Sequence, residues 1–230
     1  MKYKGMMHKR IASGIFSAIS ALGICYSAQA AEFTFDSTFV QSGSTAAVTF
    51  PLQFSNVQQN QITAYSIQRR SQGSTVWTDV TLSGCGVSSS YSMASSFIAS
   101  SGGVNGNFVA TCGPGVNAGD AARLTVTVNP QQPLILVAGP RTLASNSTTK
   151  LAWLHSGGFF QCQPYTLNNQ HPVWNPGNFA LTSQISTSTQ GDISLVASSS
   201  PKTVSFALQC IPSSFGFSIP PVAVVNVTVN

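Results

Sequence analysis

The residues that could act as acids, bases or nucleophiles in this chain form no recognised catalytic pattern. His155 precedes a Gly-Gly pair and His171 precedes a proline, so we expect both to be exposed turn residues. A Ser-His-Asp triad is arithmetically possible, but no Gly-x-Ser-x-Gly motif marks a nucleophile. We therefore predict no catalytic residue and a protein that is not an enzyme, with a hydrolase as the least favoured alternative. The acids, which make no glycosidase-type pair, are Glu32, Asp36, Asp79, Asp120 and Asp192.

Metal and cofactor sites are not indicated either. A calcium site needs several converging carboxylates, and the acids here are scattered along the chain. A zinc site needs closely spaced Cys and His ligands, and the sequence has no Cys-x-x-Cys pair. The glycine-rich segment 102–106 lacks the helix start that a phosphate-binding loop requires. We therefore expect no metal and no cofactor.

The cysteines predict a disulfide framework. The chain has 5 cysteines, and one of them, Cys25, lies in the N-terminal segment discussed below. An even set remains, which in an exported protein favours disulfides, although four cysteines permit three pairings. Each half of the chain holds one pair and closes on a similar segment, 124–129 or 225–230. We therefore expect one bridge in each half, Cys85–Cys112 and Cys162–Cys210.

The N-terminal segment has the three parts of a secretory signal peptide. Lysines and an arginine come first, a mostly apolar stretch follows over 11–26, and Ala28-Gln29-Ala30 offers a cleavage site. The apolar stretch is too short for a bilayer of roughly 30 Å, which needs about 20 residues. A lipoprotein is disfavoured because Ile24, not a small residue, precedes Cys25. We expect cleavage after Ala30, a secreted or periplasmic protein, and no stable membrane insertion afterwards.

The charge balance disfavours nucleic acid as a partner. The formal net charge is +5, but four of the ten basic residues lie before residue 31, which leaves six against five acids, or +1. Phosphate recognition needs a clustered basic surface. Arg69-Arg70 is the only adjacent basic pair beyond residue 30, and we expect it to be a solvated strand end. We predict no nucleic-acid binding.

The remaining sequence predicts strands throughout. Short runs of β-branched and aromatic residues alternate with Gly, Pro, Ser and Asn clusters, and no segment of helical length keeps a 3.6-residue period. The proline-stiffened segment 129–133 is the obvious linker, so we expect a signal peptide over 1–30 and two domains, 31–129 and 130–230, placed end to end. The predicted strands are 33–40, 46–54, 62–69, 76–82, 91–98, 107–112 and 123–128, then 134–138, 149–154, 161–165, 179–185, 193–197, 203–210 and 222–229.

The second half resembles the bacterial immunoglobulin-like domains found in tandem in exported proteins. The resemblance rests on Lys150-Leu151-Ala152-Trp153, on Cys162 nine residues later, on Trp174, and on the segment 204–210 that ends at Cys210. It implies that Trp153 lies in the core and that the cysteines bridge two sheets. The first half resembles a fibronectin-like or immunoglobulin-like sandwich more weakly, and whether its bridge joins two sheets or ties a loop to a strand stays open. The expected fold class is all-β, with two tandem immunoglobulin-like or fibronectin-like Greek-key β-sandwiches and one disulfide in each.

Loop aromatics are the candidate ligand contacts, because exposed rings stack on sugars and anchor protein partners. Trp174 lies in the turn-rich segment 171–177, where the alternative is that it caps the core, and Phe215 and Phe217 form a comparable hairpin tip. With a neutral Ser/Thr-rich surface, these residues favour an exported, non-catalytic binding or adhesion module of the bacterial envelope or secretome. Its partner would be a protein or a polysaccharide. The alternative is a structural subunit or spacer that assembles through exposed strand edges.

Overall fold

The computed structural model describes residues 30–94, 102–155, 159–165, 174, 190–196, 202–212 and 220–230. This part of the chain forms β-strands and two short 3-10 turns, and none of its helices is long and apolar enough to cross a membrane. The all-β prediction is therefore confirmed. The first half contains β1 (Ala31–Thr38), β2 (Val40–Ser42), β3 (Thr45–Ser55), η1 (Gln59–Gln61), β4 (Ile62–Arg70), β5 (Thr78–Asp79), η2 (Val80–Ser83), β6 (Gly86–Ala94), β7 (Gly103–Cys112) and β8 (Ala121–Val128). The second half contains β9 (Leu134–Gly139), β10 (Thr142–Leu143), β11 (Thr148–His155), β12 (Phe159–Pro164), β13 (Gln190–Val196), β14 (Lys202–Pro212) and β15 (Val222–Val229).

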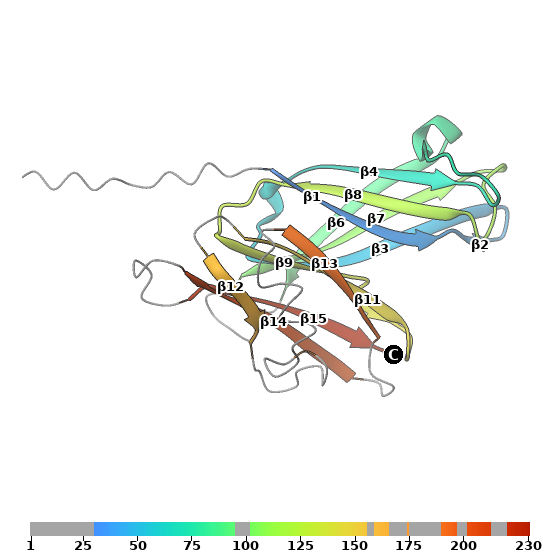
Figure 1. Ribbon diagram of the computed structural model, residues 1–230. Coiled ribbons are helices and arrows are strands. Elements are labelled where there is room, and N and C mark those ends of the chain that lie inside the picture. The colour runs from blue at the N-terminus through green and yellow to red at the C-terminus, as the bar shows by residue number, and fades with distance from the viewer. Residues whose placement is uncertain are drawn as a thin grey trace, which may run out of the picture.

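The strands form three sheets stacked as three layers (Figure 1). The first outer sheet has the strand order β1-β8-β4-β5, and the second outer sheet has the order β10-β15-β14-β12. Between them lies the central sheet, ordered β13-β11-β9-β3-β7-β6, with β2 paired to β3. Each outer sheet covers one face of the central sheet, so the fold is two β-sandwiches in tandem that share their middle layer.

Each sandwich has its own apolar core. In the first core, aromatic side chains from the first outer sheet and from the central sheet pack against one another, such as Phe33, Phe54 and Phe108. The second core contains Trp153, which is 1% exposed, together with the Cys162–Cys210 bridge. The placement of Trp153 in a core, which the immunoglobulin-like resemblance implied, is confirmed.

Strand β9 belongs to both cores. Ile135 and Val137 face the first core, whereas Leu134 and Leu136 face the second. β9 pairs with β3 on one side and with β11 on the other, both antiparallel. The end-to-end arrangement expected from the linker is therefore wrong, because the short segment 129–133 delivers β9 directly to the free side of β3. The domain boundary expected at residue 129 stays a prediction. Strands from both sides of this boundary belong to the central sheet.

Side chains of β3 also close an open edge of the second outer sheet. β10 pairs only with Thr228 and Val229 at the end of β15. The backbone of the preceding residues of β15 therefore has no strand partner on that side. Val224 N donates to Ser55 Oγ at 2.8 Å. Asn226 N donates to Gln53 Oε1. Both acceptor side chains are buried, so the contact between the two sandwiches is polar as well as apolar.

Both predicted disulfides are present, and neither joins two sheets. Cys162 on β12 is directly opposite Cys210 on β14, with Cα atoms 4.0 Å apart. Cys85 lies just before β6 and bonds to Cys112 at the end of the neighbouring strand β7. The sheet-to-sheet bridge implied by the immunoglobulin-like resemblance is therefore wrong for the second half. In the first half, the bridge ties a loop to a strand.

Candidate ligand-binding site

The sequence-predicted ligand contacts do not form a surface site in the described part of the chain. Trp174 is fully buried, and its ring lies edge-on to Phe206 at a centroid distance of 6.0 Å. Its indole Nε1 donates to the backbone oxygen of Ala207 at 2.7 Å. Trp174 therefore caps the second core and offers no face to a ligand. Phe215 and Phe217 lie outside the described residues.

Replacing Trp174 with phenylalanine should lower stability and leave ligand binding unchanged. The smaller ring loses packing volume and the indole hydrogen bond, which together cost about 1–3 kcal/mol. Ala207 O keeps the hydrogen bond from Tyr165 N, which limits the loss. Urea unfolding of oxidised protein measures the change. If the variant kept its stability but lost binding to a ligand of the wild-type protein, Trp174 would be a ligand contact.

Several of the described titratable residues are buried or make contacts within the fold. His155 is the last residue of β11 and is buried, so its expected role as an exposed turn residue is wrong. Arg69 is also not a solvated strand end: its side chain is 13% exposed and pairs with Asp120. Asp79 accepts from Thr81 N at the start of η2. In the described part of the chain, no group of three or more His, Cys, Asp and Glu residues could hold a metal ion.

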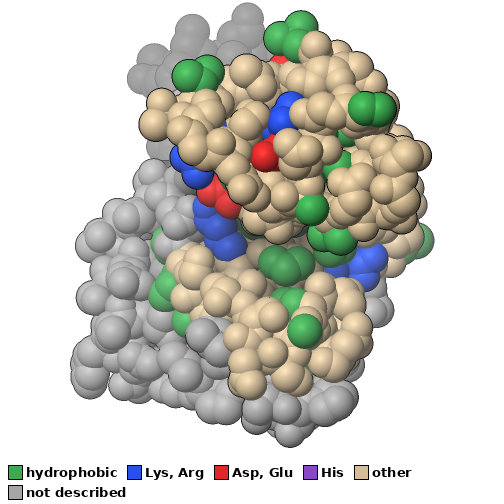
Figure 2. Space-filling model, turned by 90° about the vertical axis from the view of Figure 1, so that its right-hand side faces the viewer, with side chains coloured by type: hydrophobic (Ala, Val, Ile, Leu, Met, Phe, Trp, Pro, Cys, Tyr) green, Lys and Arg blue, Asp and Glu red, His purple; other side chains and the backbone are tan. Residues whose placement is uncertain are grey.

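Trp77, in the loop before β5, is covered by two arginines. The guanidinium carbons of Arg70 and Arg123 lie 4.9 Å and 4.3 Å from the centre of its ring. Arg123 also pairs with Asp36 through two hydrogen bonds. These contacts hold the loop before β5 against the outer face of the first outer sheet. Figure 2 shows basic and acidic side chains next to one another on the face it presents, on an otherwise mostly neutral surface.

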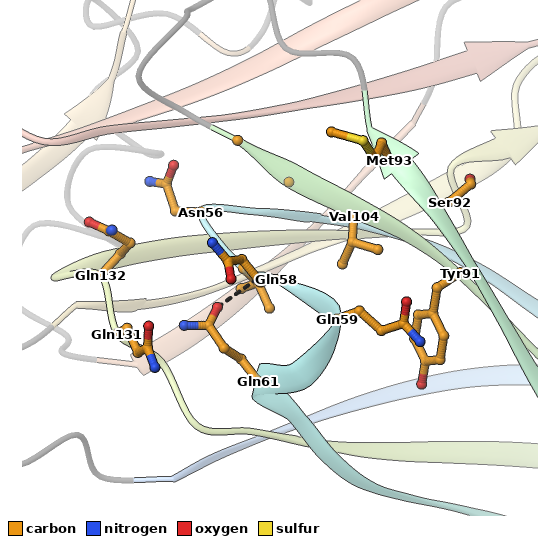
Figure 3. Close-up of a pocket in the computed structure, with 13 residues that line it drawn as sticks. Asn56, Gln58, Gln59, Gln61, Tyr91, Ser92, Met93, Val104, Gln131 and Gln132 are labelled. Atoms are coloured by element: carbon orange, nitrogen blue, oxygen red, sulfur yellow. Dashed lines mark hydrogen bonds between the residues drawn. The ribbon is translucent and has the colours of Figure 1, made fainter.

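A cavity of about 510 Å³ lies where the linker passes the end of the first sandwich. Such a volume is within the usual range of small-ligand sites, about 300–1,000 Å³. Figure 3 shows Gln131 and Gln132 on one side of it, Gln58 and Gln61 in the middle, and Tyr91 beside Gln59 on the other side. The described lining residues are Asn56, Val57, Gln58, Gln59, Gln61, Tyr91, Ser92, Met93, Gly102, Gly103, Val104, Gln131 and Gln132.

The turn η1 positions three of the five glutamines of this cavity, Gln58, Gln59 and Gln61. Gln58 N donates to Gln61 Oε1 at 2.6 Å, and this bond closes the turn (Figure 3). Val57 and Gln61 are buried, whereas Gln58 and Gln59 are exposed. Asn56 has a positive φ of 61°, a conformation that asparagine tolerates better than most residues. The turn thus presents exposed amides while its own ends are anchored.

Tyr91 is held in place by the first core. Its ring lies edge-on to Phe108, with centroids 5.8 Å apart and planes at 86°. Tyr91 is half-buried, and the next residue on the same face of β6, Met93, is 92% exposed. The cavity therefore has a rigid aromatic wall with an apolar side chain at its rim.

The cavity is uncharged but rich in hydrogen-bonding groups. None of the described lining residues carries a charge, and six of them are Asn or Gln. The amide of Asn56 is engaged, because Nδ2 donates to Leu134 O and Val222 O. The exposed amides of Gln59, Gln131 and Gln132 make no hydrogen bond within the described part of the chain. Each offers both a donor and an acceptor to a ligand.

Sequence reasoning missed this cavity because its parts are distant in the chain. The amide-rich segments 58–61 and 131–132 were visible in the sequence, but each is unremarkable alone. The pairing of β9 with β3 brings the linker beside η1, and no local pattern encodes that pairing. The clustering of glutamines in two segments between strands was the available signal.

No family model, curated protein or solved structure matches this chain. The immunoglobulin-like resemblance of the sequence therefore stays an expectation. The site has to be interpreted from its own chemistry.

Proposed function

We propose that this protein is an exported, non-catalytic binding module that recognises a neutral carbohydrate polymer through the amide-lined cavity. The observation that carries the proposal is the composition of that cavity, with exposed amides of Gln59, Gln131 and Gln132, one aromatic wall and no charge among its described residues. The two disulfides support an oxidising compartment, which agrees with the predicted cleavage after Ala30.

The chemistry of the cavity favours hydroxyl-rich ligands over charged ones. A carboxylate or phosphate would lose hydration on entering the cavity without meeting a compensating charge. Sugar hydroxyls donate and accept hydrogen bonds at once, as the amides of glutamine do. A sugar ring also has an apolar face, and Tyr91 supplies a rigid ring beside the amides. A neutral saccharide satisfies all three features.

Removing two linker amides should weaken saccharide binding about tenfold, because each lost hydrogen bond contributes about 0.5–1.5 kcal/mol. The test is calorimetry of the oxidised protein with neutral hexose, N-acetylhexosamine and uronic-acid oligosaccharides. The double variant Gln131→Ala/Gln132→Ala removes exposed groups that the fold does not use. Tyr91→Phe removes only the hydroxyl and keeps the contact with Phe108, so we expect a smaller loss.

Asn60→Ala is the matched control, since Asn60 is an exposed amide in η1 that does not line the cavity. Binding of a neutral oligosaccharide that the Gln131/Gln132 variant weakens and Asn60→Ala does not would support the proposal. Binding of the uronic-acid ligand alone, equal effects of all variants, or no binding of any neutral oligosaccharide would overturn it.

A structural role is the second candidate, and the open edge of the central sheet at β6 favours it. β1 pairs along its whole length with β8, so it is not a free segment for donation to another subunit. An assembly role would instead have to use an edge of the folded domain. The central sheet has such an edge at β6.

A further inference from the structure

The strand β6 forms an unprotected edge of the central sheet. It is nine residues long and, within the described part of the chain, pairs only with β7. It contains neither a charged residue nor a proline, and its ladder with β7 runs without a bulge. Natural proteins normally block such an edge with a charge, a proline, a bulge or a short strand, because it otherwise pairs with another chain.

The other described sheet edges each have at least one feature that disfavours pairing with a further strand. The edge strands β5 and β10 have two residues each, and β2 has three. β4 extends beyond β5, but its ladder is interrupted by a bulge between Ile62 and Ala64, and it ends in two arginines. On β1, Lys150 Nζ donates to the backbone oxygen of Thr34 at 2.7 Å. β12 ends in Pro164 and β13 contains Asp192. The contrast singles out β6 as the edge that is left available.

We propose that β6 pairs antiparallel with β6 of a second copy, about a two-fold axis at Ser90. This register is the one that overlaps the full strand, since it places Gly86 opposite Ala94 of the second copy. It also places Val87 opposite Met93 of the second copy. Met93 is 92% exposed in the single chain, and Val87 is half-buried against the first core, so the pairing covers an exposed apolar side chain. Opposed apolar pairs of this kind stabilise a sheet.

A second copy meets no like charge at this edge. Neither β6 nor its neighbour β7 carries a charge, so two identical edges meet without repulsion. A two-fold axis makes the contact self-complementary and closes it at two copies. The central sheets of both copies would become one continuous sheet. The proposal does not depend on the identity of the ligand.

The test uses opposite charges at the axis, where residue 90 of one copy faces residue 90 of the other. The Ser90 side chain is exposed, so both Ser90→Lys and Ser90→Glu are compatible with the fold. Sedimentation of the oxidised protein over a range of concentrations should show a reversible dimer. Like-charge repulsion should raise the dissociation constant of the dimer of each variant alone about tenfold or more. An equimolar mixture of the two variants should restore the dimer.

Thr49→Lys and Thr49→Glu are the controls, because Thr49 is exposed on β3, an interior strand of the same sheet. These controls should sediment as the unmodified protein does, and thermal unfolding should show that all four variants fold. A protein that is monomeric at its highest attainable concentration would overturn the proposal. So would dimers that Ser90→Lys and Ser90→Glu leave intact, or a mixture that stays dissociated.

Discussion

Replacing Asp120 with alanine is expected to lower the free energy of unfolding by about 3–5 kcal/mol, the usual cost of breaking a buried ion pair from one side. Asp120 is 1% exposed and lies between β7 and β8, with its Oδ2 atom 2.6 Å from a terminal guanidinium nitrogen of Arg69. Its carboxylate also accepts from Asn117 N and Gln72 N, each at 3.1 Å. The substitution leaves one guanidinium and two backbone donors without their acceptor.

The same carboxylate makes stability depend on pH. Burial raises the pKa of Asp120, but hydrogen bonds from Asn117 N, Arg69 and Gln72 N outweigh burial and hold the pKa below its usual value of 3.8. A folded-state pKa below the unfolded value means that the stabilisation is present above the unfolded pKa and is lost as the pH falls through the folded one. We therefore expect the wild-type protein to lose stability below about pH 4, and the Asp120→Ala variant to lose less.

Urea unfolding at neutral pH and at low pH measures both effects. Asp36→Ala is the matched control, because Asp36 also pairs with an arginine but its side chain is 60% exposed, and such pairs contribute about 0–1 kcal/mol. Arg69→Met should cost less than Asp120→Ala, since the carboxylate keeps its two backbone donors. If the free energy of unfolding of Asp120→Ala lay within about 1 kcal/mol of the wild-type value, this network would not be a stabilising element.

The sequence predicted most strands and both disulfides, because these depend on local patterns. β8 alternates partly buried and buried positions along its whole length, as a strand with one face in a core should. The pairing of cysteines followed from their placement in two halves. The segment 76–82 was an error, since only Thr78–Asp79 is strand and Val80–Ser83 forms a 3-10 turn that Asp79 caps. An acceptor side chain at a turn start competes with strand formation there.

The features that escaped prediction depend on contacts between distant segments. The uninterrupted apolar run 134–138 is the signature of a strand buried on both faces, and it explains why β9 serves two cores. Without the fold, however, nothing in this run says which strand it joins. The burial of His155 and the ion pair of Arg69 with Asp120, 51 residues later, likewise depend on the assembled sheets. The cavity beside η1 exists only because β9 brings the linker there.

Removing the two side chains that close the edge of β15 should cost about 2–6 kcal/mol in the double variant Gln53→Leu/Ser55→Ala. Each substitution leaves a backbone N–H without its acceptor, which costs about 1–3 kcal/mol when the group is buried. Ser55 is 1% exposed and accepts from Val224 N, and Gln53 is 5% exposed and accepts from Asn226 N.

Hydrogen exchange localises this effect, since the amides of Val224 and Asn226 should lose protection before those of β7 do. Thr49→Ala is the control, because Thr49 lies on the same face of β3 but is exposed. Unchanged protection of both amides in the double variant would show that β15 does not depend on β3. The comparison also bears on assembly: side chains from β3 occupy the edge of β15, whereas no described residue occupies the edge of β6. Opening the β15 edge should therefore create a second site for strand pairing, and the double variant should form species larger than the β6-linked dimer.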